Sequence, residues 1–166
     1  MRFLSLQSFH NATWTMRLAF LIVAIQQGTS PSAEAKDEVP LKGTIQAVES
    51  NDVQFPTLFV GGSGSGNATH LGHYTVTYEF EVDIPTLTGI GTFHFIAANG
   101  DSLFTEVTGQ AFPTEDPDVL FGVVMHTIVS GTGRFDGATG EFIEEVLLNA
   151  VTGVRSGSLQ GTIIKQ

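Results

Sequence analysis

Hydrophobic and polar residues alternate along the chain beyond residue 36, in short runs separated by turn residues. The clearest run is HYTVTYEFEVD, residues 73–83, in which aromatic and Val side chains share one face and Thr, Glu and Asp the other. A period of two indicates a half-buried strand, whereas no helical period is maintained anywhere beyond residue 36. The pattern therefore predicts an all-β domain.

Turn residues divide this part of the chain into consecutive β runs. The expected strands are 40–48, 57–64, 73–83, 87–97, 102–112, 119–129, 141–150 and 157–165. Eight strands with short links are typical of an up-and-down antiparallel barrel, and a sandwich is the alternative. Closure would also remove the exposed strand edges that invite aggregation.

Two turns suggest how the central strands pair. In DIPT, residues 83–86, pairing Asp83 with Thr86 would place Phe80 opposite Gly89 and Tyr78 opposite Gly91. Large side chains would then lie over glycines on a face that is almost wholly apolar. In ANGD, residues 98–101, the Asn-Gly pair is a strong hairpin signal.

Pairing Ala98 with Asp101 would bring Phe95 to Phe104 and Phe93 to Glu106. The inward face should then line a ligand site, and its expected members are Tyr74, Tyr78, Phe93, Phe95, Phe104 and Glu106. The opposite face would carry His94, Ile90, Ile96, Leu103, Thr105 and Val107, which is an apolar set for a solvent side.

Glu106 would be the one acid on the aromatic face, where burial would raise its pKa and mark a functional pocket. The alternative is that Glu106 lies near a barrel mouth and stays hydrated, or that the pairing is off by one residue.

Composition excludes several kinds of partner. The formal net charge is −10, which argues against nucleic acid and anionic membrane surfaces. Cysteine is absent from the chain, so disulfides, thiolate metal sites and a Cys nucleophile are excluded. His70 and His73 are three residues apart, but zinc needs three or four ligands, so no metal and no cofactor are expected. The acids of FPTEDPD, residues 112–118, lack the spacing of a calcium loop.

The N-terminal region has the layout of a signal peptide. A basic start and an apolar run, MRLAFLIVAI at 16–25, precede a small-x-small cleavage site at Ala33-Glu34-Ala35. The apolar run is too short to span a bilayer. We expect a signal peptide over 1–35, with Met16 as the candidate true start, and one domain over 36–166. A buried N-terminal helix is the alternative interpretation.

Two glycine-rich segments invite a catalytic interpretation. SGTGRFDGATGEF, residues 130–142, is not followed by a helix or by Gly-Lys-Ser/Thr, as a phosphate loop requires. It predicts a tight link between strands, with Phe135 pointing inward and Arg134 and Asp136 making local polar contacts. GGSGSG, residues 61–66, lacks the setting of a nucleophile elbow and suggests a flexible loop or a bulged strand.

SGTGRFDGATGEF also resembles the glycine-rich loop of the allene oxide cyclase and dirigent barrels. ATHLG at 68–72 and AANGD at 97–101 are similar to segments of small secreted bacterial proteins with an allene-oxide-cyclase-like barrel. The resemblance covers roughly residues 40–166 and implies an eight-stranded barrel with a mostly apolar lumen, often in trimers or dimers. Allene oxide cyclases fold a fatty-acid epoxide into a ring, and dirigent proteins guide coupling with acidic lumen residues. No catalytic residue of either family aligns here, so the catalytic residues stay unknown.

These observations favour a secreted or periplasmic barrel that binds a small apolar or amphipathic ligand in its lumen. A second interpretation is a cyclase-like or dirigent-like isomerase, and a third is a structural extracellular domain with a filled lumen. Lumen volume separates the third from the others, and buried acids around an open cavity would favour the isomerase. The apolar outer face predicts a homo-oligomer.

Overall fold

A computed structural model describes residues 37–165, and all eight expected strands are present there. Their bounds are β1 Asp37–Gln54, β2 Thr57–Ala68, β3 Gly72–Asp83, β4 Thr88–Ala97, β5 Ser102–Pro113, β6 Val119–Gly131, β7 Glu141–Asn149 and β8 Val154–Lys165. A 3-10 turn, η1 Gly133–Phe135, lies between β6 and β7. The signal-peptide prediction for 1–35 lies outside the described residues.

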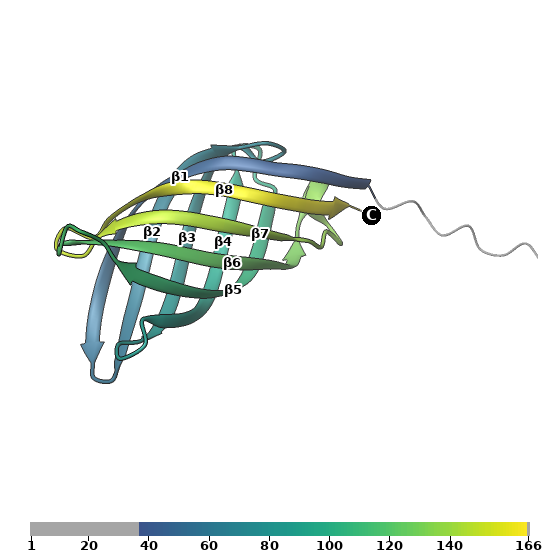
Figure 1. The fold of residues 1–166 in the computed structure, drawn as a ribbon. Helices are drawn as coiled ribbons and strands as arrows, with labels where there is room; N and C mark the ends of the chain where they lie inside the picture. The colour runs from purple at the N-terminus through teal and green to yellow at the C-terminus, as the bar shows by residue number, and fades with distance from the viewer. Residues whose placement is uncertain (1–36, 166) are drawn as a thin grey trace, which may run out of the picture. The chain divides into compact units, whose positions relative to one another are not determined.

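The strands form a closed barrel in which each pairs antiparallel with its neighbours in sequence (Figure 1). Pairing of β1 with β8, from Asp37↔Lys165 to Val48↔Val154, closes the ring. The up-and-down barrel predicted from the sequence is therefore confirmed, and the sandwich alternative is excluded.

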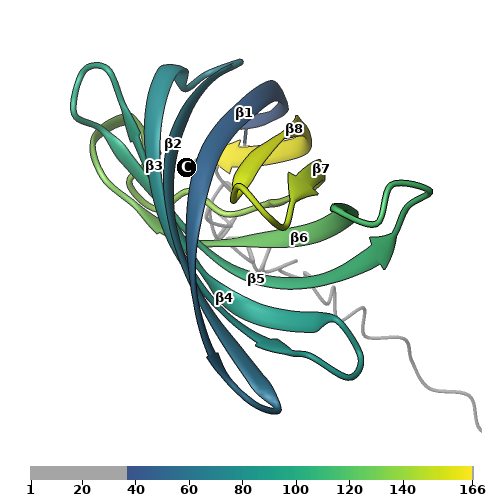
Figure 2. The ribbon, with the colours of Figure 1, turned by 90° about the vertical axis from the view of Figure 1, so that its left-hand side faces the viewer.

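The two ends of the barrel differ. At one end, which we name the plugged end, β1 begins, β8 ends and η1 folds inward, so that Phe135 is fully buried. At the other, the open end, lie the β1–β2, β3–β4, β5–β6 and β7–β8 turns (Figure 2). The link between β6 and β7 thus closes the lumen on one side, as expected for a strand connection with Phe135 inside.

The inner face is rich in aromatic residues. Tyr74, Tyr78, Phe93 and Phe95 are all buried, which confirms that these four point into the lumen. Tyr78 stacks on Phe93 with ring centroids 4.5 Å apart, and Phe93 stacks on Phe95 at 5.8 Å. This aromatic column packs the plugged half of the lumen.

The GGSGSG segment is a regular part of β2, so the interpretation as a loop or bulged strand was wrong. Gly62 pairs with Tyr78 and Gly66 with Tyr74. A Cβ at Gly62 would overlap the ring of Tyr78, and one at Gly66 would overlap the backbone carbonyl of Thr44 and then the phenol of Tyr74. The inward glycines therefore make room for the two tyrosine rings, while Ser63 and Ser65 occupy the alternate positions along the strand.

The β3–β4 hairpin pairs two residues away from the expected register. Asp83 pairs with Thr88 in place of Thr86, so Phe80 lies opposite Gly91 and Tyr78 opposite Phe93. The carboxylate of Asp83 accepts hydrogen bonds from the backbone N–H and hydroxyl of Thr86, which stabilises a four-residue loop. Because the shift is even, every side chain keeps its predicted face.

The β4–β5 hairpin differs by one residue, and this reverses the faces of β5. Phe93 pairs with Thr105 and His94 with Phe104, since the link is a three-residue loop, 98–100, in which Gly100 has φ 89° and Asn99 does not have a positive φ. The placement of Phe104 and Glu106 on the lumen face was therefore wrong. Leu103, Thr105 and Val107 are buried inside instead, whereas Ile90 and Ile96 are exposed as expected.

Arg134 makes the local polar contacts expected of the glycine segment. Its Nη2 donates to the carbonyl of Leu71 at 3.2 Å, and its Nε lies 3.6 Å from a carboxylate oxygen of Asp101. These contacts tie the η1 link to the β2–β3 and β4–β5 turns at the plugged end. Asp101 also accepts a hydrogen bond from Asn99, which with Arg134 lowers the pKa of this carboxyl.

Candidate functional site

A cavity of about 160 Å³ lies inside the open end of the barrel. Aliphatic side chains and Phe80 form most of its wall, and the polar groups that line it are Glu49 and Arg155, with Asn51 and Gln110 exposed. The aliphatic lining comes from five strands and from the β3–β4 and β7–β8 turns, and it comprises Leu58, Val60, Val82, Leu87, Ala111, Leu120, Val124, Val146, Leu148 and Ala150.

The cavity exists because inward positions on three neighbouring strands carry no side chain. Gly89 on β4, Gly109 on β5 and Gly122 on β6 all line it, and Gly89 pairs directly with Gly109. In the plugged half the matching positions hold Phe93, Phe95 and other large residues. An eight-stranded barrel can be filled by side chains or leave room for one small ligand, and this one is filled in the plugged half and has a cavity in the open half.

Between the two halves lies a network of buried charged groups. Arg155 on β8 is only 4% exposed and contacts two carboxylates. Its Nε donates to Oε1 of Glu144 on β7 at 3.1 Å, and its Nη1 donates to Oε1 of Glu49 on β1 at 2.9 Å. Its Nη2 lies 2.7 Å from Oε2 of Glu144, outside hydrogen-bond geometry. Two carboxylates share one guanidinium, so the group carries one excess negative charge.

His126 on β6 extends this network. Its Nε2 lies 3.2 Å from Oε2 of Glu144 and its Nδ1 lies 3.0 Å from the hydroxyl of Thr105. An ionised carboxylate can only accept, so Nε2 carries the hydrogen. In a neutral ring Nδ1 is then an acceptor, and Thr105 donates to it. Stacking on Phe142, with centroids 4.3 Å apart, fixes the plane of the imidazole.

The protonation states follow from burial and from these contacts. Burial alone would raise the pKa of Glu144, but the hydrogen bond from His126 and the charge of Arg155 outweigh it, so that the pKa is lowered. Burial lowers the pKa of His126 in spite of Glu144, so the imidazole is neutral. Burial would lower the pKa of Arg155, but Glu144 and its other partners raise it.

Aromatic rings support the guanidinium from the side. Its central carbon lies 4.9 Å from the ring centroid of Tyr78 and 5.5 Å from that of Phe93. The hydroxyl of Tyr78 donates to Oε1 of Glu49 at 3.2 Å. Burial and the carboxylate of Glu49 raise the pKa of Tyr78, so the phenol stays protonated and remains a donor.

The two carboxylates differ in their remaining capacity. Both oxygens of Glu144 contact His126 or Arg155, and Glu144 does not line the cavity. Glu49 does line it, and its Oε1 takes the bonds from Arg155 and Tyr78. Within residues 37–165 no group donates to its Oε2, although the side chain is only 3% exposed. Glu49 is therefore the acceptor that faces the cavity.

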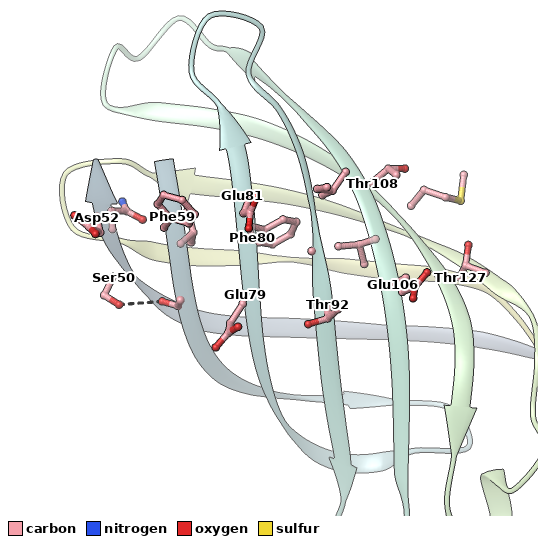
Figure 3. A pocket seen from close by; sticks show the side chains of 17 residues that line it. Ser50, Asp52, Phe59, Glu79, Phe80, Glu81, Thr92, Glu106, Thr108 and Thr127 are labelled. Carbon is pink, nitrogen blue, oxygen red and sulfur yellow. Dashed lines mark hydrogen bonds between the residues drawn. The ribbon is translucent and has the colours of Figure 1, made fainter. Parts of the chain in front are cut away.

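A larger hollow, of about 940 Å³, lies on the outer wall over β1 to β6 (Figure 3). Glu79, Glu81 and Glu106 line it, and all three carboxylates are exposed. The barrel wall curves here without enclosing a space, so this hollow is a surface open to solvent, whereas the cavity in the lumen has largely aliphatic walls. Glu106 belongs to this outer surface, as the alternative of a pairing off by one residue held.

The sequence-predicted site residues are thus divided. Tyr78 and Phe93 support the charged network, and Tyr74 and Phe95 pack deeper in the plugged half, while Phe104 stacks on His94 on the outer wall. None of these five side chains lines the open-end cavity. A role in lining a ligand stays a prediction for the four inward aromatic residues.

Sequence reasoning missed Glu49, His126, Glu144 and Arg155, although a signal existed. Each is a charged or imidazole side chain that interrupts a mostly apolar or glycine set on the inner face of its strand. In β8, for example, Arg155 shares its face with Gly157, Leu159, Gly161 and Ile163. Four such interruptions, on the adjacent strands β1, β8, β7 and β6, indicate a buried polar network.

In the part of the chain that the structure describes, no group of three or more histidine and carboxylate side chains is arranged to hold a metal ion. Among the same residues, no helix is long and apolar enough to cross a membrane. No protein-family model matches the chain, and a search of curated proteins finds no match. The architecture and the site therefore define a class only, a closed eight-stranded barrel with a small apolar cavity above a buried charged network.

Proposed function

We propose that this protein binds a small apolar or amphipathic molecule in the open end of its lumen. The observation that carries the proposal is the cavity of about 160 Å³ with its largely aliphatic wall. Apolar cavities of roughly 150 Å³ stay dry and take up benzene. The matching ligand is a single small ring, or one end of a longer molecule that extends past Asn51 and Gln110 into solvent.

Titration with toluene, followed by amide chemical shifts, tests this proposal. We expect shifts at Val60, Leu148 and neighbouring lining residues. Ala111→Leu adds a side chain to the cavity wall and should abolish these shifts. Thr108→Leu makes a similar change on the outer wall of the same strand and should leave them unchanged. Absence of any cavity shift in the original protein would refute the proposal.

An isomerase is a second candidate, because buried acids border an open cavity. Glu49 reaches that cavity and Glu144 lies behind it. This supports a cyclase-like activity of the kind that the allene oxide cyclase resemblance implies, with Glu49 in the place first suggested for Glu106. Native mass spectrometry would recover a co-purified compound. Conversion of that compound to a product of equal mass, lost in Glu49→Gln, would establish the isomerase, and no conversion would refute it.

Export to the cell exterior or the periplasm forms part of the proposal. It rests on the signal-peptide layout over 1–35, and β1 begins at Asp37, so that cleavage after Ala35 would leave every strand intact. N-terminal sequencing of the protein recovered outside the cytoplasm should give Lys36 as its first residue. An uncleaved N-terminus on that material would contradict the signal-peptide assignment.

A further inference from the structure

We propose that the polar end of the bound molecule is a hydrogen-bond donor, a hydroxyl or a protonated amine, held by Oε2 of Glu49. The proposal rests on the cavity function proposed above and adds the chemical class of the ligand. It excludes a carboxylate ligand, which is the class that a buried arginine would otherwise suggest.

The geometry leaves one acceptor at the floor of the cavity. Oε1 of Glu49 receives Nη1 of Arg155 at 2.9 Å and the hydroxyl of Tyr78 at 3.2 Å. These two donors fix the orientation of the carboxylate. Oε2 has no donor among residues 37–165, and the side chain lines the cavity while being almost fully buried. Among the described residues, the one buried side-chain nitrogen or oxygen without a partner is Nη2 of Arg155, so Oε2 of Glu49 borders accessible space, where a ligand hydroxyl or ammonium can donate to it.

The arginine cannot serve as an anion site. Nε and Nη1 of Arg155 already donate to Glu144 and Glu49, and Nη2 is inaccessible to solvent beside Oε2 of Glu144. With His126 neutral, the two carboxylates exceed the one guanidinium in charge. A second anion in the apolar cavity would be repelled by this excess, whereas a neutral or cationic donor would be attracted.

Four probes of similar size separate the alternatives: toluene, benzyl alcohol, benzylamine and benzoate. Binding is measured by chemical-shift titration at the amides of Val60 and Leu148, so that amine bound to the acidic outer wall is not counted. Benzylamine and benzoate are both charged and similar in size, so the ratio of their affinities reports whether the site at Glu49 prefers a positive or a negative ligand. We expect benzylamine to bind at least about tenfold more tightly than benzoate, since hydrogen bonds to charged groups are the stronger class.

Glu49→Gln removes the charge and keeps an acceptor for Tyr78 and Arg155. We expect it to weaken benzylamine about tenfold and benzyl alcohol about fivefold, and to leave toluene within about twofold. Glu106→Gln makes the same change of charge on the outer wall and should leave all four affinities unchanged. If Glu49→Gln does not fold, the ranking of the four probes on the original protein decides alone.

The outcomes separate this inference from the function on which it rests. Toluene shifts in the cavity together with benzoate equal to or tighter than benzylamine would overturn the donor assignment and leave the cavity function standing. No cavity shift with any probe would overturn both. A strong preference for benzylamine over benzyl alcohol identifies a cationic ligand, and comparable affinities identify a hydroxyl compound.

Discussion

Replacing Arg155 by methionine should destabilise the barrel strongly. The substitution retains much of the side-chain volume but removes the charge that Glu49 and Glu144 share. Removing one partner of a buried ion pair costs about 3–5 kcal/mol, because the charge left behind has neither water nor a counterion. With a urea slope of about 2 kcal/mol per molar, the midpoint should fall by roughly 2 M.

Urea unfolding followed by far-ultraviolet circular dichroism measures this change. Arg134→Met is the matched control, because Arg134 pairs with Asp101 on the surface and its side chain is 41% exposed. Loss of such a surface pair should cost less than about 1 kcal/mol.

The pH dependence of the Arg155→Met penalty tests its cause. Arg155 is one of the groups that lower the pKa of Glu144 against the effect of burial. Without Arg155 the hydrogen bond from His126 is left to oppose burial, so the pKa of Glu144 rises and the carboxyl takes up a proton in the folded state at a higher pH than in the original protein. The penalty should therefore shrink between pH 7 and pH 5. An Arg155→Met protein within 1 kcal/mol of the original at pH 7 would refute the reasoning about the network.

Three further changes test other parts of the structure. Lowering the pH through 6.5, the ordinary pKa of histidine, should reduce the free energy of unfolding, because the unfolded chain protonates His126 while the folded state, in which the pKa of His126 is lowered, does not. The lowered pKa of Glu144 extends this loss of stability below pH 4.5. Equal urea midpoints at pH 8 and pH 5 would contradict this prediction. Phe93→Ala should cost about 3–5 kcal/mol in urea unfolding and Phe104→Ala much less, whereas equal costs would contradict the observed register. The homo-oligomer predicted from the sequence should appear in sedimentation equilibrium, and Ile90→Lys, at a position 62% exposed on the outer wall, should shift it towards monomer; a monomeric mass at every concentration would refute self-association.

Alternation predicted the strands and the direction of most side chains, because a residue's face depends only on its position in its own strand. The lengths of β1 and β2 were harder to predict. Both strands are longer than the pattern suggested. The mostly polar residues 50–54 of β1 pair with β2, and the glycine run 61–66 of β2 pairs with β1. Local composition there resembles a loop, and only the partner strand makes it regular.

Register was the part that sequence could not decide. Both faces of β5 offer large apolar residues, Leu103 and Val107 on one and Phe104 on the other, so alternation fits either. The choice depends on whether Asn99 and Gly100 both take the left-handed conformation, as the expected two-residue turn requires, or Gly100 alone does. In the structure only Gly100 of the two has a positive φ. One residue in a loop thus moved Glu106 from the expected site to the outer wall.

The candidate site shows how far single-strand patterns extend. They could have identified Arg155 and Glu144 as buried polar residues, but not as partners. In the strand ladder Arg155 pairs with Leu148 and Glu144 pairs with Leu159, so their side chains meet on a diagonal between the two strands. The diagonal follows from the tilt and stagger of strands in a closed barrel.

The charged network and the cavity also depend on each other. Inward glycines above Glu49 leave space, and a buried carboxylate with an unused oxygen needs either water or a ligand in that space. Filling the lumen with apolar side chains would be at least as stable as holding these charges, so the stability of the barrel alone does not account for the arrangement. The ligand binding that we propose at Glu49 would account for it.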